Sequence, residues 1–187
     1  GENAPDGFEI INQAEAATVR SMMANKEIEI TDSWQTEAAI TALDAMEGVS
    51  VNTYMTGHLM YMMLNNQSAP TDDVHFRKAL AYCLDYDTAA SIFPGSKAPN
   101  GPVSSVLAGW DSSLPTLKQD MDKAKAELAQ SGYADSLDSH PLTLYWVSDV
   151  PDEEKLALLL QSNAAELGIQ IEVKSVPWTG FVDLVTS

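Results

Sequence analysis

The fold is decided by the stretch Asp72-Asp-Val-His-Phe-Arg-Lys-Ala-Leu-Ala-Tyr-Cys-Leu-Asp-Tyr-Asp87. Its apolar residues recur at intervals of three and four, the spacing of one face of an α-helix. They are Phe76, Ala79, Leu80, Cys83 and Leu84. Asp72 and Asp73 stand before the first turn, where carboxylates accept hydrogen bonds from free N–H groups and meet the positive end of the helix dipole. The pattern therefore predicts a helix over residues 73–84, then a short helix over residues 88–93 that Pro94 and Gly95 end.

The composition describes an acidic globular protein. The chain has 187 residues, of which 27 are acidic and 10 basic, and its formal net charge is −17. A surface of this charge repels the phosphates of nucleic acids and of anionic lipids, so we expect neither as a partner. No stretch contains the roughly 18 consecutive apolar residues of a membrane helix. The single cysteine, Cys83, excludes an intrachain disulfide and is expected to be a small buried hydrophobic residue.

The first fifty residues have the pattern of alternating strands and helices. Short strands are expected over residues 8–11, 27–30 and 49–53, and helices over residues 14–25 and 36–46. A strand, a helix and a strand in this order predict a parallel crossover unit. Asn25 is expected to adopt a left-handed conformation after the first helix, as glycine commonly does, and Gly48 is expected to end the second.

The middle of the chain is irregular. Residues 54–58 break the pattern before a second apolar run over residues 59–64, which ends in Asn65-Asn66-Gln67. Residues 94–119 are rich in Pro, Gly and Ser and predict a long loop. Loops of this length without regular structure are uncommon in compact domains and often serve a function.

The last third of the chain predicts a helix followed by a strand–helix–strand unit. A helix is expected over residues 120–131, with Asp120 as its cap and Gly132 just after its end. A strand over residues 142–147, a helix over residues 152–167 and a strand over residues 170–176 follow. The predicted fold class is therefore α/β.

Four of these stretches, taken in order, resemble one family. Asp73-Val-x-x-Arg77-x-Ala79-Leu80-x-x-x-Leu84-Asp85 resembles the signature D-V-R-V-R-x-A-L-x-x-A-I-D of the family 5 extracellular solute-binding proteins. These are the peptide-, dipeptide- and nickel-type binding proteins of ABC importers. Further similar segments are Glu27–Ile30, Asp122–Tyr133, and Leu167–Val173 with the following Trp178-x-x-Phe181. Lys26 and Glu29 depart from the family pattern, which has glycine and aspartate there.

The resemblance covers residues 8–187 and implies a fold. The family has a type II periplasmic-binding-protein-like fold, in which two lobes of mixed sheet flanked by helices close on the ligand. Residues 1–65 would be a lobe I segment with the hinge crossover, and residues 66–187 would be lobe II. Because no secretion signal opens the chain and its last residues read as part of a helix, we expect it to be cut from a longer protein.

The resemblance also implies a function and partners. It predicts an extracytoplasmic solute-binding component of an ABC importer, periplasmic or a cell-surface lipoprotein, that binds peptides or another small molecule and docks on permease subunits. The membrane would be reached only through a lipid anchor that this sequence lacks. Alternatives are a receptor of the same fold for a nickel complex or an oligosaccharide, a sensor domain, and an unrecognised enzyme.

No catalytic or cofactor motif is present, and His58, His75 and His140 lack the spacing of metal ligands. We therefore predict no catalytic residues, no metal and no cofactor. Tyr54, Thr56 and His58 are the candidate ligand-binding residues. They lie in the break before the expected lobe crossing, a region that approaches the main chain of the ligand in the proteins that this chain resembles.

Overall fold

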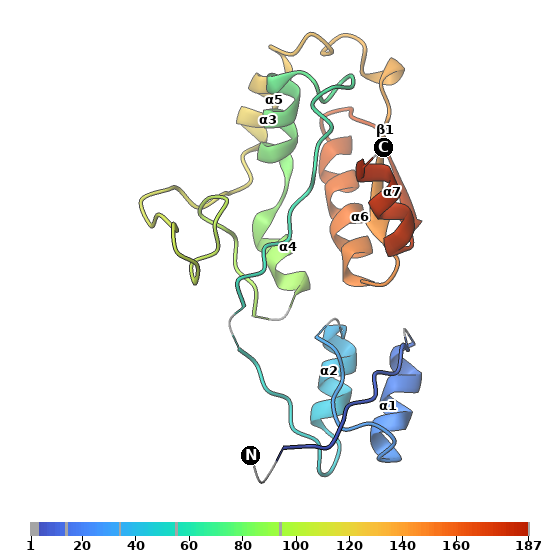
Figure 1. Cartoon of the computed structure of the whole chain (residues 1–187). Coiled ribbons are helices and arrows are strands. Elements are labelled where there is room, and N and C mark those ends of the chain that lie inside the picture. The colour runs from blue at the N-terminus through green and yellow to red at the C-terminus, as the bar shows by residue number, and fades with distance from the viewer. Residues whose placement is uncertain (1–3, 14, 34, 55, 94, 187) are drawn as a thin grey trace. The chain divides into compact units, whose positions relative to one another are not determined.

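The computed structural model of the chain describes residues 4–13, 15–33, 35–54, 56–93 and 95–186. It divides into two compact units, Gly1–Val51 and Asn52–Ser187 (Figure 1). The predicted division into residues 1–65 and 66–187 stays a prediction, because it refers to the two lobes of a longer protein.

Two helices form the N-terminal unit. They are α1 (Ala16–Ala24) and α2 (Glu37–Asp44), which lie in contact with each other. Val19 of α1 and Leu43 of α2 are buried. The Thr36 side chain accepts a hydrogen bond from the backbone N–H of Ala39 and so caps α2. Both predicted helices are confirmed, although Ala14, the expected first residue of α1, lies outside the described residues.

The strands predicted in the N-terminal unit are wrong. Residues 8–11, 27–30 and 49–53 are irregular, and the Ile10 side chain is 94% exposed. The predicted parallel crossover therefore does not form. Alternation of apolar and polar residues only makes a stretch suitable for a sheet, whereas a strand exists only where another strand pairs with it. The left-handed residue after α1 is Lys26, with φ of 60°, and Asn25 is right-handed.

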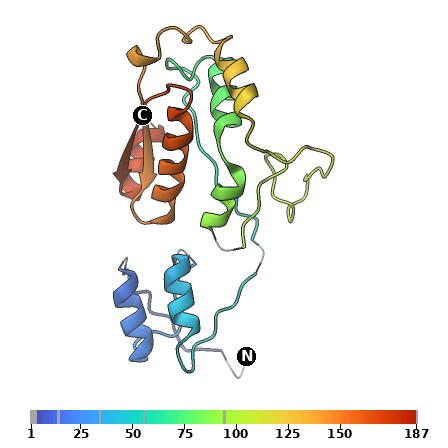
Figure 2. The same ribbon diagram turned by 180° about the vertical axis from the view of Figure 1, so that it is seen from behind.

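The C-terminal unit holds the remaining elements. These are α3 (Val74–Cys83), α4 (Tyr86–Ile92), α5 (Met121–Leu128), η1 (Leu137–Ser139), β1 (Leu142–Val147), α6 (Asp152–Ala165), β2 (Ile171–Val176) and α7 (Trp178–Thr186). Figures 1 and 2, which show opposite sides, place α3 beside α5. Helices α6 and α7 both contact β1 and β2.

The helix predicted from residues 73–84 is confirmed, and its cap explains where it begins. Asp73 Oδ1 accepts hydrogen bonds from the backbone N–H groups of His75 and Phe76, at 2.7 and 3.0 Å. Asp85 caps α4 in the same way through the N–H groups of Asp87 and Thr88, so α4 begins two residues earlier than predicted. Pro94, its expected stop, lies outside the described residues.

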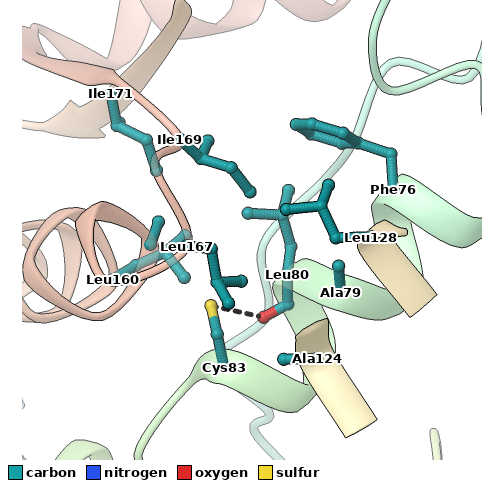
Figure 3. Packing of buried hydrophobic residues seen from close by; sticks show 11 residues of the cluster. Phe76, Ala79, Leu80, Cys83, Ala124, Leu128, Leu160, Leu167, Ile169 and Ile171 are labelled. Carbon is teal, nitrogen blue, oxygen red and sulfur yellow. Dashed lines mark hydrogen bonds between the residues drawn. The ribbon is translucent and has the colours of Figure 1, made fainter. Parts of the chain in front are cut away.

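The core is built from the predicted apolar face of α3 and three later elements. Figure 3 shows α3 residues facing side chains of α5, of α6 and of the stretch that leads into β2. The cluster consists of Phe76, Ala79, Leu80, Cys83, Ala124, Leu128, Leu160, Ala164, Leu167, Ile169 and Ile171. Cys83 is buried as predicted, and burial raises the pKa of its thiol to about 11. It is therefore a packing residue and a poor nucleophile.

The strand–helix–strand unit is confirmed. β1 and β2 pair in parallel, with Leu142 opposite Ile171 and Val147 opposite Val176, and α6 connects them. Gly168, with φ of 79°, follows the helix and turns the chain toward β2. The α/β class is confirmed, and the sheet of the described residues has two parallel strands rather than a mixed set.

One helix end differs from its prediction. α5 stops at Leu128 rather than at residue 131, and Gly132 does not have a positive φ. Its backbone N–H instead donates to Asp73 Oδ2 across 3.1 Å. Gly132 therefore joins two helices and does not serve as the left-handed cap of α5.

Candidate ligand-binding segment

The predicted site residues lie on residues 52–54 and 56–64, which form neither helix nor strand. Figures 1 and 2 show residues 56–64 passing beside α4 and α3 before the turn at residues 65–72. Met62 and Leu64 pack against the core, whereas Tyr61 and Met63 are exposed. The apolar run over residues 59–64 thus alternates like a strand, but no strand of the described residues pairs with it.

The three candidate residues occupy the exposed first half of this segment. Tyr54 is 75% exposed, and Thr56 and His58 are exposed as well. Thr56 Oγ1 accepts a hydrogen bond from the backbone N–H of His58 at 3.4 Å, across a bend at Gly57. The bend brings a phenol, a hydroxyl and an imidazole to the surface within five residues, a set that can donate to and accept from the amide groups of a ligand.

The long loop borders the candidate residues. A Cβ atom added at Gly57 would lie 3.0 Å from Leu107 Cδ2, and one added at Gly95 would lie 4.0 Å from Thr53 Cγ2. Thr53 therefore lies beside the start of the loop, and Gly57 lies against Leu107 in its middle. The sequence predicted the two features separately, and the structure brings them together.

The described residues of the C-terminal unit form hollows elsewhere, and the two considered next are not lined by the candidate residues. One, of about 420 Å³, is lined by Asp72, Asp73, Gly132 and Tyr133. In it the Tyr133 hydroxyl donates to Asp72 Oδ1 at 2.8 Å, which raises the pKa of Tyr133. Because Asp73 is also engaged by backbone N–H groups, these polar groups hold the fold together.

The second hollow, of about 500 Å³, has a different lining and a mixed polar and apolar character. Its residues come from η1, from α6 and from the stretch leading into β2. The Gln161 amide donates to the carbonyl of Ile171, and Gln170 donates to Asp138. The side-chain amides of both glutamines in this hollow therefore already donate hydrogen bonds to other protein atoms.

The histidines do not gather into a metal site. His75 Nδ1 lies 2.7 Å from Glu127 Oε2, and this contact is the first cause of the lowered pKa of Glu127. The ring of His140 packs on Tyr133 with centroids 4.8 Å apart. Among the described residues, no three His, Cys, Asp or Glu side chains could hold a metal ion. The sequence did not predict the contact between His75 and Glu127, because the two residues are 52 positions apart.

None of the helices that the structure describes is long and apolar enough to cross a membrane.

The α/β unit, with its parallel strand–helix–strand and its capped α3–α5 pair, has the fold of periplasmic binding proteins of known structure. The oligopeptide-binding protein AppA from Bacillus subtilis, solved in complex with a nonapeptide, matches it with a TM-score of 0.77. It is 18% identical in sequence, and the match covers 91% of this chain and 36% of AppA.

The family follows from the sequence comparison. The model of "Bacterial extracellular solute-binding proteins, family 5 Middle" matches residues 1–187. The chain therefore belongs to family 5 of the bacterial extracellular solute-binding proteins. This confirms the predicted family and its extracytoplasmic class.

Two curated relatives illustrate the ligands found among similar proteins. "Probable D,D-dipeptide-binding periplasmic protein DdpA" of Escherichia coli K12 is 29% identical over 166 residues, covering 87% of this chain and 31% of DdpA. Heme-binding protein A of Haemophilus influenzae is 23% identical over 131 residues, covering 66% of this chain and 23% of that protein. The chain thus spans about a third or less of these relatives. Both are named as binding proteins rather than enzymes.

Proposed function

We propose that this chain is part of the peptide-capturing subunit of an ABC importer. The observation that carries the proposal is the family match over residues 1–187, supported by the 29% identity to a dipeptide-binding protein over most of the chain. The protein would bind its ligand reversibly, without catalysis, and deliver it to permease subunits in the membrane.

In this proposal the lobes follow the sequence prediction. Residues 1–65 contribute a lobe I segment and the crossover, and residues 66–187 contribute lobe II. Residues 52–54 and 56–64 form neither helix nor strand, which suits a crossover between lobes. Tyr54, Thr56 and His58 would contact the ligand from this crossover.

The chemistry of the segment suits a peptide. Peptide amides offer one donor and one acceptor at each residue, and tight capture requires that these groups be paired when water is removed. Tyr and Thr hydroxyls both donate and accept, so Tyr54 and Thr56 can pair with either kind of group. Exposed Tyr61 and Met63 add apolar area beside them for peptide side chains.

The experiment is recovery of the natural ligand from the full-length protein. We expect the protein purified from its native host, after mild denaturation, to release peptides that mass spectrometry identifies. Calorimetric titration of the emptied protein with those peptides should then give a 1:1 complex. A protein that releases no peptide and binds none at millimolar concentration would contradict the proposal.

Heme is the second candidate ligand, because one relative is named for it. Its match covers less of the chain, at lower identity, than the match to the dipeptide-binding protein. Titration of the emptied protein with hemin, followed by the Soret absorption band, separates the two ligands. Saturable hemin binding without peptide binding would favour the second candidate.

A further inference from the structure

The long loop, residues 95–119, joins α4 to α5 and is tied together internally (Figure 1). Trp110 Nε1 donates to Asn100 Oδ1 at 2.9 Å, and the N–H of Leu117 donates to the carbonyl of Pro99 at 3.1 Å. Both bonds join the first half of the loop to the second. The loop therefore has a defined shape, although it contains neither helix nor strand.

The end of the loop is fixed to α3. The Gln119 side chain donates to the carbonyl of Cys83 at 2.8 Å, and the N–H of Asp120 donates to the carbonyl of Tyr82, also at 2.8 Å. Both carbonyls belong to the last turn of α3, whose apolar face lies in the core. The loop is thus held at a set position on the C-terminal unit.

Within the loop, two backbone hydrogen bonds fix Leu107. Its N–H donates to the carbonyl of Ser104 at 2.9 Å, and its carbonyl accepts from the N–H of Trp110 at 3.3 Å. Trp110 is also the residue whose ring bonds to Asn100. The place of the Leu107 side chain therefore follows from bonds on both sides of it.

The Leu107 side chain occupies the room that Gly57 leaves by having no side chain. A Cβ atom added at Gly57 would lie 3.0, 3.2 and 3.3 Å from Leu107 Cδ2, Cγ and Cδ1. The φ of Gly57 is not positive, so glycine is needed here for space rather than for backbone conformation. Both residues belong to the C-terminal unit, so the contact is made within this chain and does not depend on which surfaces the longer protein covers.

Gly57 forms the bend between two of the candidate ligand residues. Across it Thr56 Oγ1 accepts from the N–H of His58 at 3.4 Å, which is long for a hydrogen bond. No strand of the described residues pairs with residues 56–64, so this backbone has no ladder of hydrogen bonds to fix it. The packing of Leu107 therefore adds order at a point where hydrogen bonding is weak.

We propose that Leu107 is a positioning residue of the ligand site, which packs on Gly57 and so holds Thr56 and His58 in the arrangement that receives the ligand. This inference rests on the proposed function and its candidate residues. A loose bend would have to be ordered when the ligand binds, and the conformational entropy lost at that moment would weaken the affinity. Leu107 lowers this cost because it orders the bend before the ligand arrives.

A second contact supports the same role for the loop. A Cβ atom added at Gly95 would lie 4.0 Å from Thr53 Cγ2, and Thr53 directly precedes Tyr54, the third candidate residue. The loop thus meets the chain just before Tyr54 and again between Thr56 and His58. This is the pattern expected of a support for all three side chains.

The test uses the full-length protein. Leu107→Ala removes most of the contact with Gly57. Leu117→Ala is the matched control, because Leu117 is a leucine of the same loop that is 41% exposed where Leu107 is 51% exposed, and its bond to Pro99 is made by the backbone. Leu107→Met keeps an apolar side chain of similar volume and is the conservative variant. Calorimetry measures affinity for the co-purified peptide, and mass spectrometry measures hydrogen exchange of residues 56–64 without ligand.

We expect Leu107→Ala to weaken peptide affinity about three- to tenfold and to speed hydrogen exchange in residues 56–64 of the ligand-free protein. Leu117→Ala should change neither, and Leu107→Met should stay within about twofold of the wild-type affinity. Because Leu107 is half-exposed, its truncation should leave the melting temperature nearly unchanged. Wild-type affinity of Leu107→Ala, or an equal loss in Leu117→Ala, would overturn the proposal.

The contact itself is tested by exchanging the sizes of its two partners. Gly57→Ala adds a methyl group where Leu107 lies and should weaken peptide affinity about threefold or more. Combining it with Leu107→Ala gives that methyl group room, so the double variant should bind peptide better than Gly57→Ala alone. Losses of affinity that simply multiply would show that the two residues act independently, and the proposal would be wrong.

The positioning proposal and the peptide proposal fail in different ways. A wild-type protein that binds no peptide contradicts peptide capture, and hydrogen exchange, which needs no ligand, then decides on Leu107. Unchanged exchange of residues 56–64 in Leu107→Ala, measured well below its melting temperature, overturns the positioning role in every case. If combined alanine substitution of Tyr54, Thr56 and His58 lowered peptide affinity and Leu107→Ala did not, the ligand site would stand and Leu107 would have no part in it.

Discussion

The carboxylate of Asp73 and the backbone N–H of Gly132 are joined by a 3.1 Å hydrogen bond across 59 residues of sequence. The other oxygen of the same carboxylate caps α3 through His75 and Phe76. The Asp73 side chain therefore caps the start of α3 and also joins α3 to Gly132, which follows α5. This double use accounts for the lowered pKa of Asp73, whose first cause is the hydrogen bond from Phe76.

Removal of this carboxylate should destabilise the C-terminal unit. Because Asp73 is partly exposed, we expect Asp73→Ala to lower the free energy of unfolding by about 1–2 kcal/mol, the range for a lost N-cap. Asp73→Asn keeps an oxygen for the cap and should lose less. Urea denaturation followed by circular dichroism measures both. An alanine variant as stable as the wild type would show that water replaces the carboxylate without loss.

The same carboxylate should make stability depend on pH. Its pKa is lower in the folded protein than the ordinary value of 3.8, so the unfolded chain binds a proton more readily. The contribution is complete above pH 3.8 and is lost as pH falls through the folded pKa. We expect the stability difference between wild type and Asp73→Asn to be constant from pH 7 to pH 5 and to shrink below pH 4. A difference that persists unchanged at pH 2.5 would contradict this origin.

The predicted apolar face of α3 is core, and Leu80 is 4% exposed within it. Leu80→Ala should lower the free energy of unfolding by about 2–5 kcal/mol, because it removes buried methyl groups and leaves a cavity. Leu158→Ala is the matched control, since Leu158 is 46% exposed on α6 and should change stability by about 0.5 kcal/mol or less. Equal melting transitions for the two variants would show that the core assignment is wrong.

The candidate ligand residues can be tested together. Combined alanine substitution of Tyr54, Thr56 and His58 in the full-length protein should weaken peptide binding by tenfold or more, since each removes a polar partner of a desolvated ligand. The three side chains are exposed, so the melting temperature without ligand should not change. Calorimetric titration with the co-purified peptide gives the affinity. If this variant bound the peptide with wild-type affinity, these three residues would not be part of the ligand site.

The 187-residue chain alone should fold but should not bind peptide. It spans about a third of its relatives, and the full ligand site of a two-lobed protein buries most of the ligand surface. Each tenfold loss of affinity corresponds to about 1.4 kcal/mol, so a few missing contacts move micromolar binding to millimolar. We expect no heat of binding at about 100 μM peptide, where the full-length protein saturates. Comparable affinity of the isolated chain would place the whole site within these residues.

The sequence by itself determined the elements whose causes are local. The apolar stripe of α3 and the aspartates before it led to a correct helix and to correct core residues, and the patterns over residues 142–147 and 152–167 led to β1 and α6. The same stretches, through their order of residues, led to the correct family. Helix periodicity and capping operate within a few residues, so one stretch contains its own explanation.

The tertiary structure decided what depends on residues far apart. Residues 8–11, 27–30 and 49–53 look like strands, yet a strand requires backbone partners that a local pattern cannot supply. The bond between Asp73 and Gly132, the pair of His75 and Glu127, and the contact of Leu107 with Gly57 likewise join distant positions. Such contacts exist only after the chain has closed on itself, because each depends on where two separate elements are packed.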